Sequence, residues 1–235
     1  AYHARAKVYD LARGHDARPW CLTVSFTHPH DPYVARKKYW DLYEDCAHLE
    51  PEVPAMAYED HDPHSKRIFD ANDWRSFDIT REDIRRARRA YFANISYLDD
   101  KIGAILQVLE DTRQEAIVLF VSDHGDMLGE RGLWFKMSFY EGSARVPLMI
   151  SAPGLTPQRI DTPVSTIDVT PTLGALAGVD ISPVVMTDER GNVVSFKTIT
   201  GTWAEKLVRT VVGSMGGEAS MCPYPMPVGQ AKTAT

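Results

Sequence analysis

The sequence has few cysteines and no long apolar run, and each absence excludes a class of protein. Its three cysteines, Cys21, Cys46 and Cys222, stand far apart, and no Cys-x-x-Cys pair occurs. This spacing argues against a disulfide framework and against a structural zinc site. No apolar stretch reaches the roughly 18–20 residues that a membrane-spanning helix needs, and no signal-peptide pattern is present. We therefore expect a cytoplasmic protein that does not span a membrane.

Basic residues are also fewer than acidic residues. Lysine and arginine number 26 against 32 aspartate and glutamate residues, which leaves a formal net charge of −6. A mildly acidic chain has no general electrostatic attraction for nucleic acid or for anionic lipid, so we expect neither as a partner. The 235 residues, 44% of them hydrophobic, are instead enough for one sizeable globular domain or for part of a larger one.

The first part of the chain predicts one strand and a long irregular segment. The apolar and β-branched run Trp20–Phe26 is typical of a buried strand, and the two prolines of the following segment, 27–32, end it. From about Tyr33 to Phe77 the chain is rich in acidic residues, histidine and proline, and only a short helix near 35–43 is expected there. A segment of this kind is commonly functional or mobile.

The middle of the chain predicts a long amphipathic helix. Thr80 and Asp83 match the capping-box pattern that opens helices. Apolar residues then recur at steps of three and four, which is the helical period. These positions are Ile84, Ala87, Tyr91, Ile95, Leu98, Ile102, Ile105 and Leu109.

Two further apolar strands and a second helix complete the predicted architecture. Residues 116–121 form a continuous apolar run, which is typical of a parallel strand covered on both faces, and residues 146–150 predict a second buried strand. The dipeptide Thr170-Pro171 predicts the start of a helix that ends near Gly178. The sequence therefore predicts an α/β fold, a mostly parallel sheet sandwiched by helices.

Polar residues stand where two of the predicted strands end, which is where α/β folds place their sites. Asp123 and His124, followed by a glycine that permits a sharp turn, offer one oxygen ligand and one imidazole. His28 and His30 flank a proline and could bind a metal or an oxyanion. From these residues alone, a structural turn at the first end and a surface-loop role at the second stay open.

Several motifs in a fixed order resemble the type I sulfatase family, which has the alkaline-phosphatase-like fold. The matching pieces are Asp123-His124-Gly125, Lys136 in an aromatic segment, Glu141-Gly142 with Arg145-Val146-Pro147-Leu148, His28-Pro29-His30-Asp31-Pro32 and Asp168-Val169-Thr170-Pro171-Thr172. Within that family, His30-Asp31-Pro32-Tyr33 and 129–137 are most similar to choline-sulfatases. The resemblance covers roughly residues 8–182. It implies a partial sulfatase catalytic domain at 1–185, followed by a divergent, poorly patterned segment at 186–235.

The resemblance also implies roles for individual residues. Asp123 and His124 match ligands of a divalent cation, for which Ca²⁺ is favoured and Mg²⁺ or Mn²⁺ are alternatives. His28 and Lys136 match donors to the sulfate oxygens, whereas His30 lies outside the matched set. This chemistry is reasonable, because cleaving the S–O bond of a sulfate ester requires the charge on its oxygens to be neutralised. A solvated lysine and structural histidines remain the alternatives.

The nucleophile of that family is missing from the sequence. Family members carry a Cys-x-Pro-Ser-Arg-like segment whose cysteine is converted to formylglycine, and none of the three cysteines here lies in such a segment. The Asp pair that supplies further metal ligands is also missing. In family order both elements precede His28, so we expect them upstream of Ala1 and expect this polypeptide alone to be inactive. Its sheet should then have an unpaired edge and exposed apolar faces beside Trp20–Phe26 and 116–121.

Two other polar groups are interpreted as structural. A basic cluster on the predicted long helix is read as a solvated, partly ion-paired helix face; it consists of Arg81, Arg85, Arg86, Arg88 and Arg89. His61 and His64 lie in an acidic loop, where a role as metal ligand is the less favoured interpretation.

The leading hypothesis is a metal-dependent sulfuric ester hydrolase that, in its full-length form, hydrolyses choline O-sulfate to choline and sulfate. The expected partner is a small-molecule sulfate ester, and homo-oligomerisation of the full-length protein is left open. One alternative is a phosphodiesterase or phosphonate hydrolase of the same superfamily. A second alternative, from a different class, is a non-catalytic remnant that binds an anion or a metal.

Overall fold

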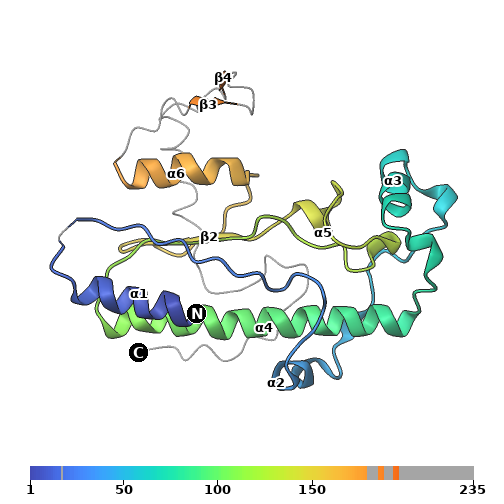
Figure 1. The fold of residues 1–235 in the computed structure, drawn as a ribbon, viewed down its shortest axis with the longest axis horizontal. Coiled ribbons are helices and arrows are strands. Elements are labelled where there is room, and N and C mark those ends of the chain that lie inside the picture. Colours follow the sequence, from blue (N-terminus) through green and yellow to red (C-terminus); the bar gives the residue numbers. More distant parts are fainter. Residues whose placement is uncertain (17, 179–184, 188–192, 196–235) are drawn as a thin grey trace. The chain divides into compact units, whose positions relative to one another are not determined.

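The computed structural model describes residues 1–16, 18–178, 185–187 and 193–195 (Figure 1). The chain divides into two compact units, the first made of 1–115 with 124–145 and the second of 116–123 with the residues from 146 onward. The predicted segment 186–235, with Cys222, lies almost wholly outside the described residues, so its divergent character stays a prediction. Among the described helices, none has the length and apolarity that crossing a membrane requires.

The long helix α4, Arg81–Asp111, belongs to the first unit. It confirms the helix predicted from periodicity. Its capping box is present: the Thr80 hydroxyl accepts from the Asp83 amide at 3.2 Å, and the Asp83 carboxylate accepts from the Thr80 amide at 3.1 Å. The cap satisfies amides that have no partner within the helix.

Two shorter helices pack along α4 (Figure 1). The predicted helix near 35–43 is confirmed as α2, Lys37–Trp40, followed by the 3₁₀ helix η1, Asp41–Tyr43. The hydroxyl of Tyr39 in α2 donates to Asp100 of α4 at 2.6 Å. The other helix, α1, Tyr2–Arg13, was not predicted, because its sequence has few apolar positions and buries only Val8.

The segment between α2 and α4 is more ordered than its sequence suggested. It contains η2, Ala47–Leu49; η3, Tyr58–Asp60; α3, Pro63–Ala71; and η4, Trp74–Ser76. Its apolar residues share a buried core with the loop that follows Asp126, and this core consists of Ile68, Trp74, Met127, Leu133 and Trp134. The same loop contains η5, Glu130–Gly132, and leads to α5, Glu141–Ala144.

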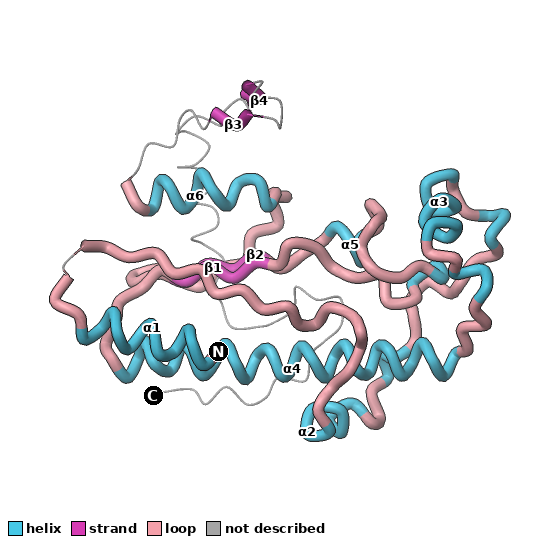
Figure 2. Tube along the Cα trace, viewed as in Figure 1, coloured by secondary structure: helices cyan, strands magenta, loops and turns pink. Residues whose placement is uncertain are grey.

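The second unit contains the predicted strands, but they pair in the opposite sense. Strand β1, Val118–Val121, pairs antiparallel with β2, Leu148–Ser151, so the expectation of parallel neighbours is wrong for this pair. Parallel pairing needs a crossover, usually a helix, that brings the chain back to its starting edge. The connection here is mostly loop, with only the short helices η5 and α5 (Figure 2). Strands β3, Val185–Thr187, and β4, Val193–Ser195, are also antiparallel.

Two other predicted elements differ from the structure. The helix α6, Val169–Leu176, follows the 3₁₀ helix η6, Thr166–Asp168, so Pro171 lies in the first turn rather than at the first helical position. The segment Trp20–Phe26 forms no strand in the described structure, although exposed and half-buried residues alternate along it. That alternation fits one face of an extended segment, but a strand also needs a hydrogen-bonded neighbour, which the described residues do not provide.

The capping box yields a stability prediction. Replacing Thr80 by Ala should lower the free energy of unfolding by about 1 kcal/mol, because the Asp83 amide loses its acceptor. The conservative variant Thr80→Ser keeps the hydroxyl and should behave like the unchanged protein. Urea unfolding of the complete protein measures both. Equal losses in the two variants would show that the cap does not stabilise α4.

Candidate active site

Two loops of the first unit meet at the residues that the sequence singled out. One loop follows Phe26, and the other begins at His124. The hydroxyl of Tyr33 donates to Asp126 at 2.8 Å, and its ring lies 6.1 Å from that of Trp134. Lys136 Nζ lies 2.9 Å from His30 Nε2. The structure therefore joins motifs that are about 100 residues apart in sequence.

The Asp126 carboxylate stabilises the conformation of the second loop, which begins at His124, through hydrogen bonds with the loop's backbone. Its Oδ1 atom accepts from the amides of Leu128, at 2.9 Å, and Phe135, at 3.1 Å. Burial raises the pKa of the Asp126 carboxyl, while these amides and the Tyr33 hydroxyl oppose the rise. The pKa of Tyr33 is also raised, first by burial and then by the neighbouring Asp126. Neither residue was singled out from the sequence, although Tyr33 stands inside one quoted motif and Asp126 directly follows another.

The backbone of this loop is unusually constrained. Five of its residues have left-handed φ values, and three of them are not glycine; they are Leu128, Gly129, Arg131, Gly132 and Phe135. Bulky residues adopt this conformation only when the surroundings enforce it. The bond from the Met127 amide to the Phe135 carbonyl, at 2.7 Å, closes the loop just before Lys136. Lys136 therefore leaves a fixed backbone.

The contact between Lys136 and His30 defines how the imidazole is protonated. A lysine ammonium can only donate, so His30 Nε2 must accept and its Nδ1 carries the proton. Nδ1 lies 2.9 Å from both the backbone carbonyl and the carboxylate of Asp31, which can accept that proton. The result is a chain of contacts from Asp31 through His30 to a positively charged Lys136, which is half-buried.

His28 lies against the long helix α4. Its ring lies 4.8 Å from that of Tyr97 on α4, and Arg36 and Lys101 stack on the same tyrosine. The structure therefore brings His30 into contact with Lys136 and places His28 against α4 in a basic environment. His30 lies inside a matching motif but outside the matched set of sulfate donors, and the residues themselves held no signal that it, rather than His28, contacts Lys136.

Asp123 and His124 come directly after β1, as predicted. His124 Nδ1 lies 2.9 Å from the Gly125 carbonyl, an acceptor, so a neutral ring carries its lone pair on Nε2. Histidines that bind metals commonly make this kind of second bond, so the residue fits the predicted role. Across the described residues, no three histidine, cysteine, aspartate or glutamate side chains gather into a metal site. Asp123 and His124 can therefore be only part of a ligand set, and their role stays a prediction.

The basic cluster on α4 is paired as predicted, but one member is not solvated. Arg81 and Arg85 both bind Glu50, at 3.0 and 2.6 Å. Arg88 is fully buried and contacts the loop at Glu130. Its burial follows from the segments that lie against it, at His48 and at Leu128 and Glu130, which periodicity alone does not reveal.

The two loop histidines, His61 and His64, both contact other protein groups in the described residues. His61 is buried against the ring of Phe69, with centroids 4.8 Å apart, and His64 contacts the Met137 carbonyl at 2.9 Å.

Comparison with known proteins identifies the family. A sequence profile of the sulfatase family matches residues 4–179, which is most of the chain. The chain therefore belongs to the sulfatase family, as its motifs indicated.

Two individual relatives show how similar this chain is to particular sulfatases and how much of their length it covers. Choline-sulfatase of Rhizobium meliloti (strain 1021) is 61% identical over 189 residues, which cover 78% of this chain and 37% of the relative. Arylsulfatase of Clostridium perfringens (strain 13 / Type A) is 37% identical over 147 residues, covering 61% of this chain and 30% of the relative. The chain thus spans about a third of the length of these relatives.

Comparison with a solved structure shows that the fold is similar as well. The phosphonate monoester hydrolase of Agrobacterium radiobacter matches with a TM-score of 0.60 and 26% identity, over 76% of this chain and 38% of that one. The described residues thus form part of a sulfatase-like domain, with more helix and fewer strands than the sequence predicted.

The turn after β1 yields a prediction, because Gly125 leaves no room for a side chain. A Cβ atom there would lie 2.1 Å from the Gly142 carbonyl oxygen, while the Gly125 amide donates to Ser143 at 2.8 Å. Gly125→Ala should therefore lower the free energy of unfolding by about 1–3 kcal/mol and displace His124. Thermal and urea unfolding of the complete protein measure the loss.

The matched control is Gly103→Ala on α4, where an added Cβ meets nothing within 4 Å. This change should stabilise the helix by about 0.5–1 kcal/mol. If Gly125→Ala is as well tolerated as Gly103→Ala, the close approach at the turn does not constrain the site.

Proposed function

We propose that the complete protein containing this chain is a sulfuric ester hydrolase that acts on choline O-sulfate. The contact of 2.9 Å between Lys136 and His30 carries the proposal, because it gathers a fixed positive charge and an imidazole at one place. The choice of choline O-sulfate rests on the relative named choline-sulfatase, which is 61% identical.

The residues of this chain would bind and polarise the ester. The Lys136 ammonium can donate to sulfate oxygens and stabilise the charge that develops as the S–O bond lengthens. His30, held by Asp31, can exchange its bond to Lys136 for one to the substrate, and His28 is the second candidate donor. Asp123 and His124 would hold part of a divalent cation site, for which Ca²⁺ remains our proposal, and the cation would neutralise further charge when bound.

A phosphonate ester hydrolase is the second candidate. Its support is the structural likeness to phosphonate monoester hydrolases from Agrobacterium radiobacter and Silicibacter pomeroyi, with TM-scores of 0.60 and 0.57. Turnover of choline O-sulfate against a phosphonate monoester by the complete protein separates the two. A protein that binds sulfate but turns over neither ester would match the non-catalytic alternative.

The site residues give the first functional prediction. In the complete protein, Lys136→Ala should lower kcat/KM about 10²-fold or more, because removing one positioned donor typically has an effect of this size. His28→Ala is predicted to do the same, and His30→Ala tests the contact that the structure shows. Steady-state kinetics on choline O-sulfate measure all three. Near-normal turnover in all of them would place the sulfate elsewhere.

The metal assignment gives a separate prediction. Asp123→Ala in the complete protein should lower both bound divalent metal, measured by elemental analysis, and turnover, because a carboxylate is a preferred ligand of hard cations. The neighbouring Asp126 is no suitable control, since it shapes the loop. Asp111→Ala at the end of α4 is the control, and this variant protein should contain as much divalent metal as the unchanged protein. Unchanged metal content in Asp123→Ala would remove the assignment.

The third prediction concerns residues 1–235 expressed alone. They should release no sulfate from any ester, because no segment here supplies the family's activated nucleophile. They should also self-associate, since Ile117, Met149 and Trp20 are 44%, 37% and 37% exposed. Sulfate release and sedimentation velocity test the two parts. An active, monodisperse monomer would contradict both, and an inactive monomer would contradict only the second.

A further inference from the structure

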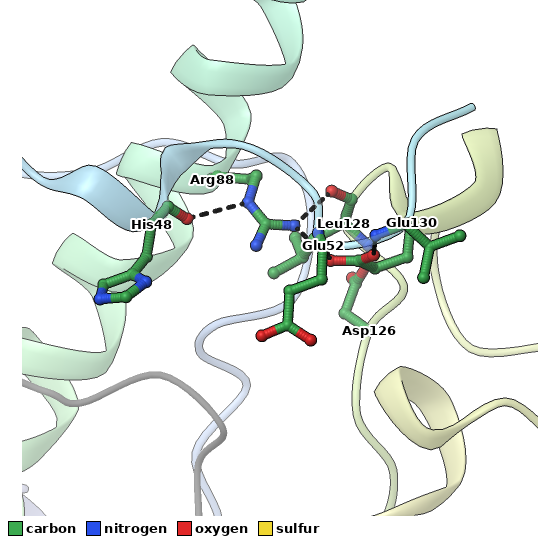
Figure 3. Close-up of polar contacts among 7 residues, drawn as sticks. His48, Glu52, Arg88, Asp126, Leu128 and Glu130 are labelled. Atoms are coloured by element: carbon green, nitrogen blue, oxygen red, sulfur yellow. Dashed lines mark hydrogen bonds and ion pairs between the residues drawn. The ribbon is translucent and has the colours of Figure 1, made fainter.

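The buried guanidinium of Arg88 lies directly beneath the loop that carries Lys136. The side chain is 0% exposed, on the eighth residue of α4. A buried charge is tolerated only with close partners. Figure 3 shows these partners on two other segments: Nη1 donates to the Leu128 carbonyl at 3.0 Å and to Glu130 at 3.2 Å, and Nε donates to the His48 carbonyl at 3.3 Å.

Glu130 extends the same set of contacts further along the segment that contains His48. Its carboxylate accepts from the amides of Glu52, at 3.0 Å, and Val53, at 2.8 Å (Figure 3). The Val53 carbonyl in turn accepts from the Arg131 amide at 2.9 Å. The ion pair of Arg88 and Glu130 thus joins α4, residues 48–53 and the loop into one unit.

Leu128 is the loop residue whose backbone is held by these contacts. It is buried and left-handed, with φ of 47°, a conformation that a leucine does not adopt by preference. Its amide is held by Asp126 at 2.9 Å and its carbonyl by Arg88 at 3.0 Å. Both sides of the strained residue are therefore fixed by buried or half-buried charges.

The path from this clamp to Lys136 is short. Asp126 also holds the Phe135 amide at 3.1 Å, and Phe135 precedes Lys136. A loop released from Arg88 can relax at Leu128, which would shift the far end of the loop and its lysine. A misplacement of about 1 Å in a catalytic group can cost about 10²-fold in rate.

We propose that the buried Arg88–Glu130 ion pair positions Lys136 for its contact with the sulfate oxygens. The proposal rests on the function given above, in which Lys136 is a sulfate donor. Arg88 is a positioning residue, since it acts through the loop and does not contact the substrate.

The test is a double-mutant cycle in the complete protein, with kcat/KM for choline O-sulfate as the readout. Arg88→Lys keeps the charge but cannot contact three acceptors in the planar geometry of arginine. It should lower kcat/KM about 10- to 10²-fold. In the Lys136→Ala background it should cause no further loss, because its effect passes through the lysine. Glu130→Gln removes the charge of the partner and serves as the second variant should Arg88→Lys fail to fold.

Arg86→Lys is the matched control. It lies two residues earlier on α4, its side chain is 63% exposed, and its partner Asp83, at 4.0 Å, belongs to the same helix. Its kcat/KM should be unchanged.

Two results would overturn the proposal. One is normal kcat/KM in folded Arg88→Lys or Glu130→Gln. The other is an equal loss from Arg88→Lys with and without Lys136, which is the behaviour of a residue that only stabilises the fold. The Lys136→Ala variant by itself tests the proposed function. If kcat/KM falls in Lys136→Ala but is normal in Arg88→Lys, only the positioning role of Arg88 is wrong.

Discussion

The buried charge of Arg88 is the interaction on which the candidate site depends. Removing one partner of a buried ion pair commonly costs about 3–5 kcal/mol, because the other partner stays buried without compensation. Here the pair also satisfies backbone groups of two largely irregular segments, 48–53 and 128–131, which contain only parts of the short 3₁₀ helices η2 and η5. Without it, those segments would bury polar groups at considerable cost. The ion pair therefore allows loops, rather than regular elements, to build this part of the domain.

The same constraint explains why the candidate site residues can lie on loops and still have fixed positions. The loop lies on an apolar core that includes Met127, Leu133 and Trp134, and it is fixed at both ends by Asp126. Lys136 leaves this fixed backbone and contacts His30, whose own loop is tied to Asp126 through Tyr33. Packing thus provides stability, and a few buried polar contacts determine where the positive charge is placed.

Local rules predicted what depends on local sequence. The capping box and apolar period of α4 were predicted correctly, as were both strands of the pair β1 and β2, because caps and apolar runs act over a few residues. Strand direction, the lack of a strand at Trp20–Phe26 in the described structure and the burial of Arg88 were not predictable, since each depends on which distant segment lies alongside. The site shows the same division. The motifs indicated Lys136 and the two histidines, but only the folded chain shows that His30 contacts the lysine.

The most direct test of this account is a crystal structure of the complete protein with inorganic sulfate bound. The account predicts a sulfate oxygen within about 3 Å of Lys136 Nζ and of a ring nitrogen of His28 or His30. It also predicts that the Leu128 carbonyl still accepts from Arg88. Sulfate bound at another place, with Lys136 still in contact with His30 alone, would contradict it.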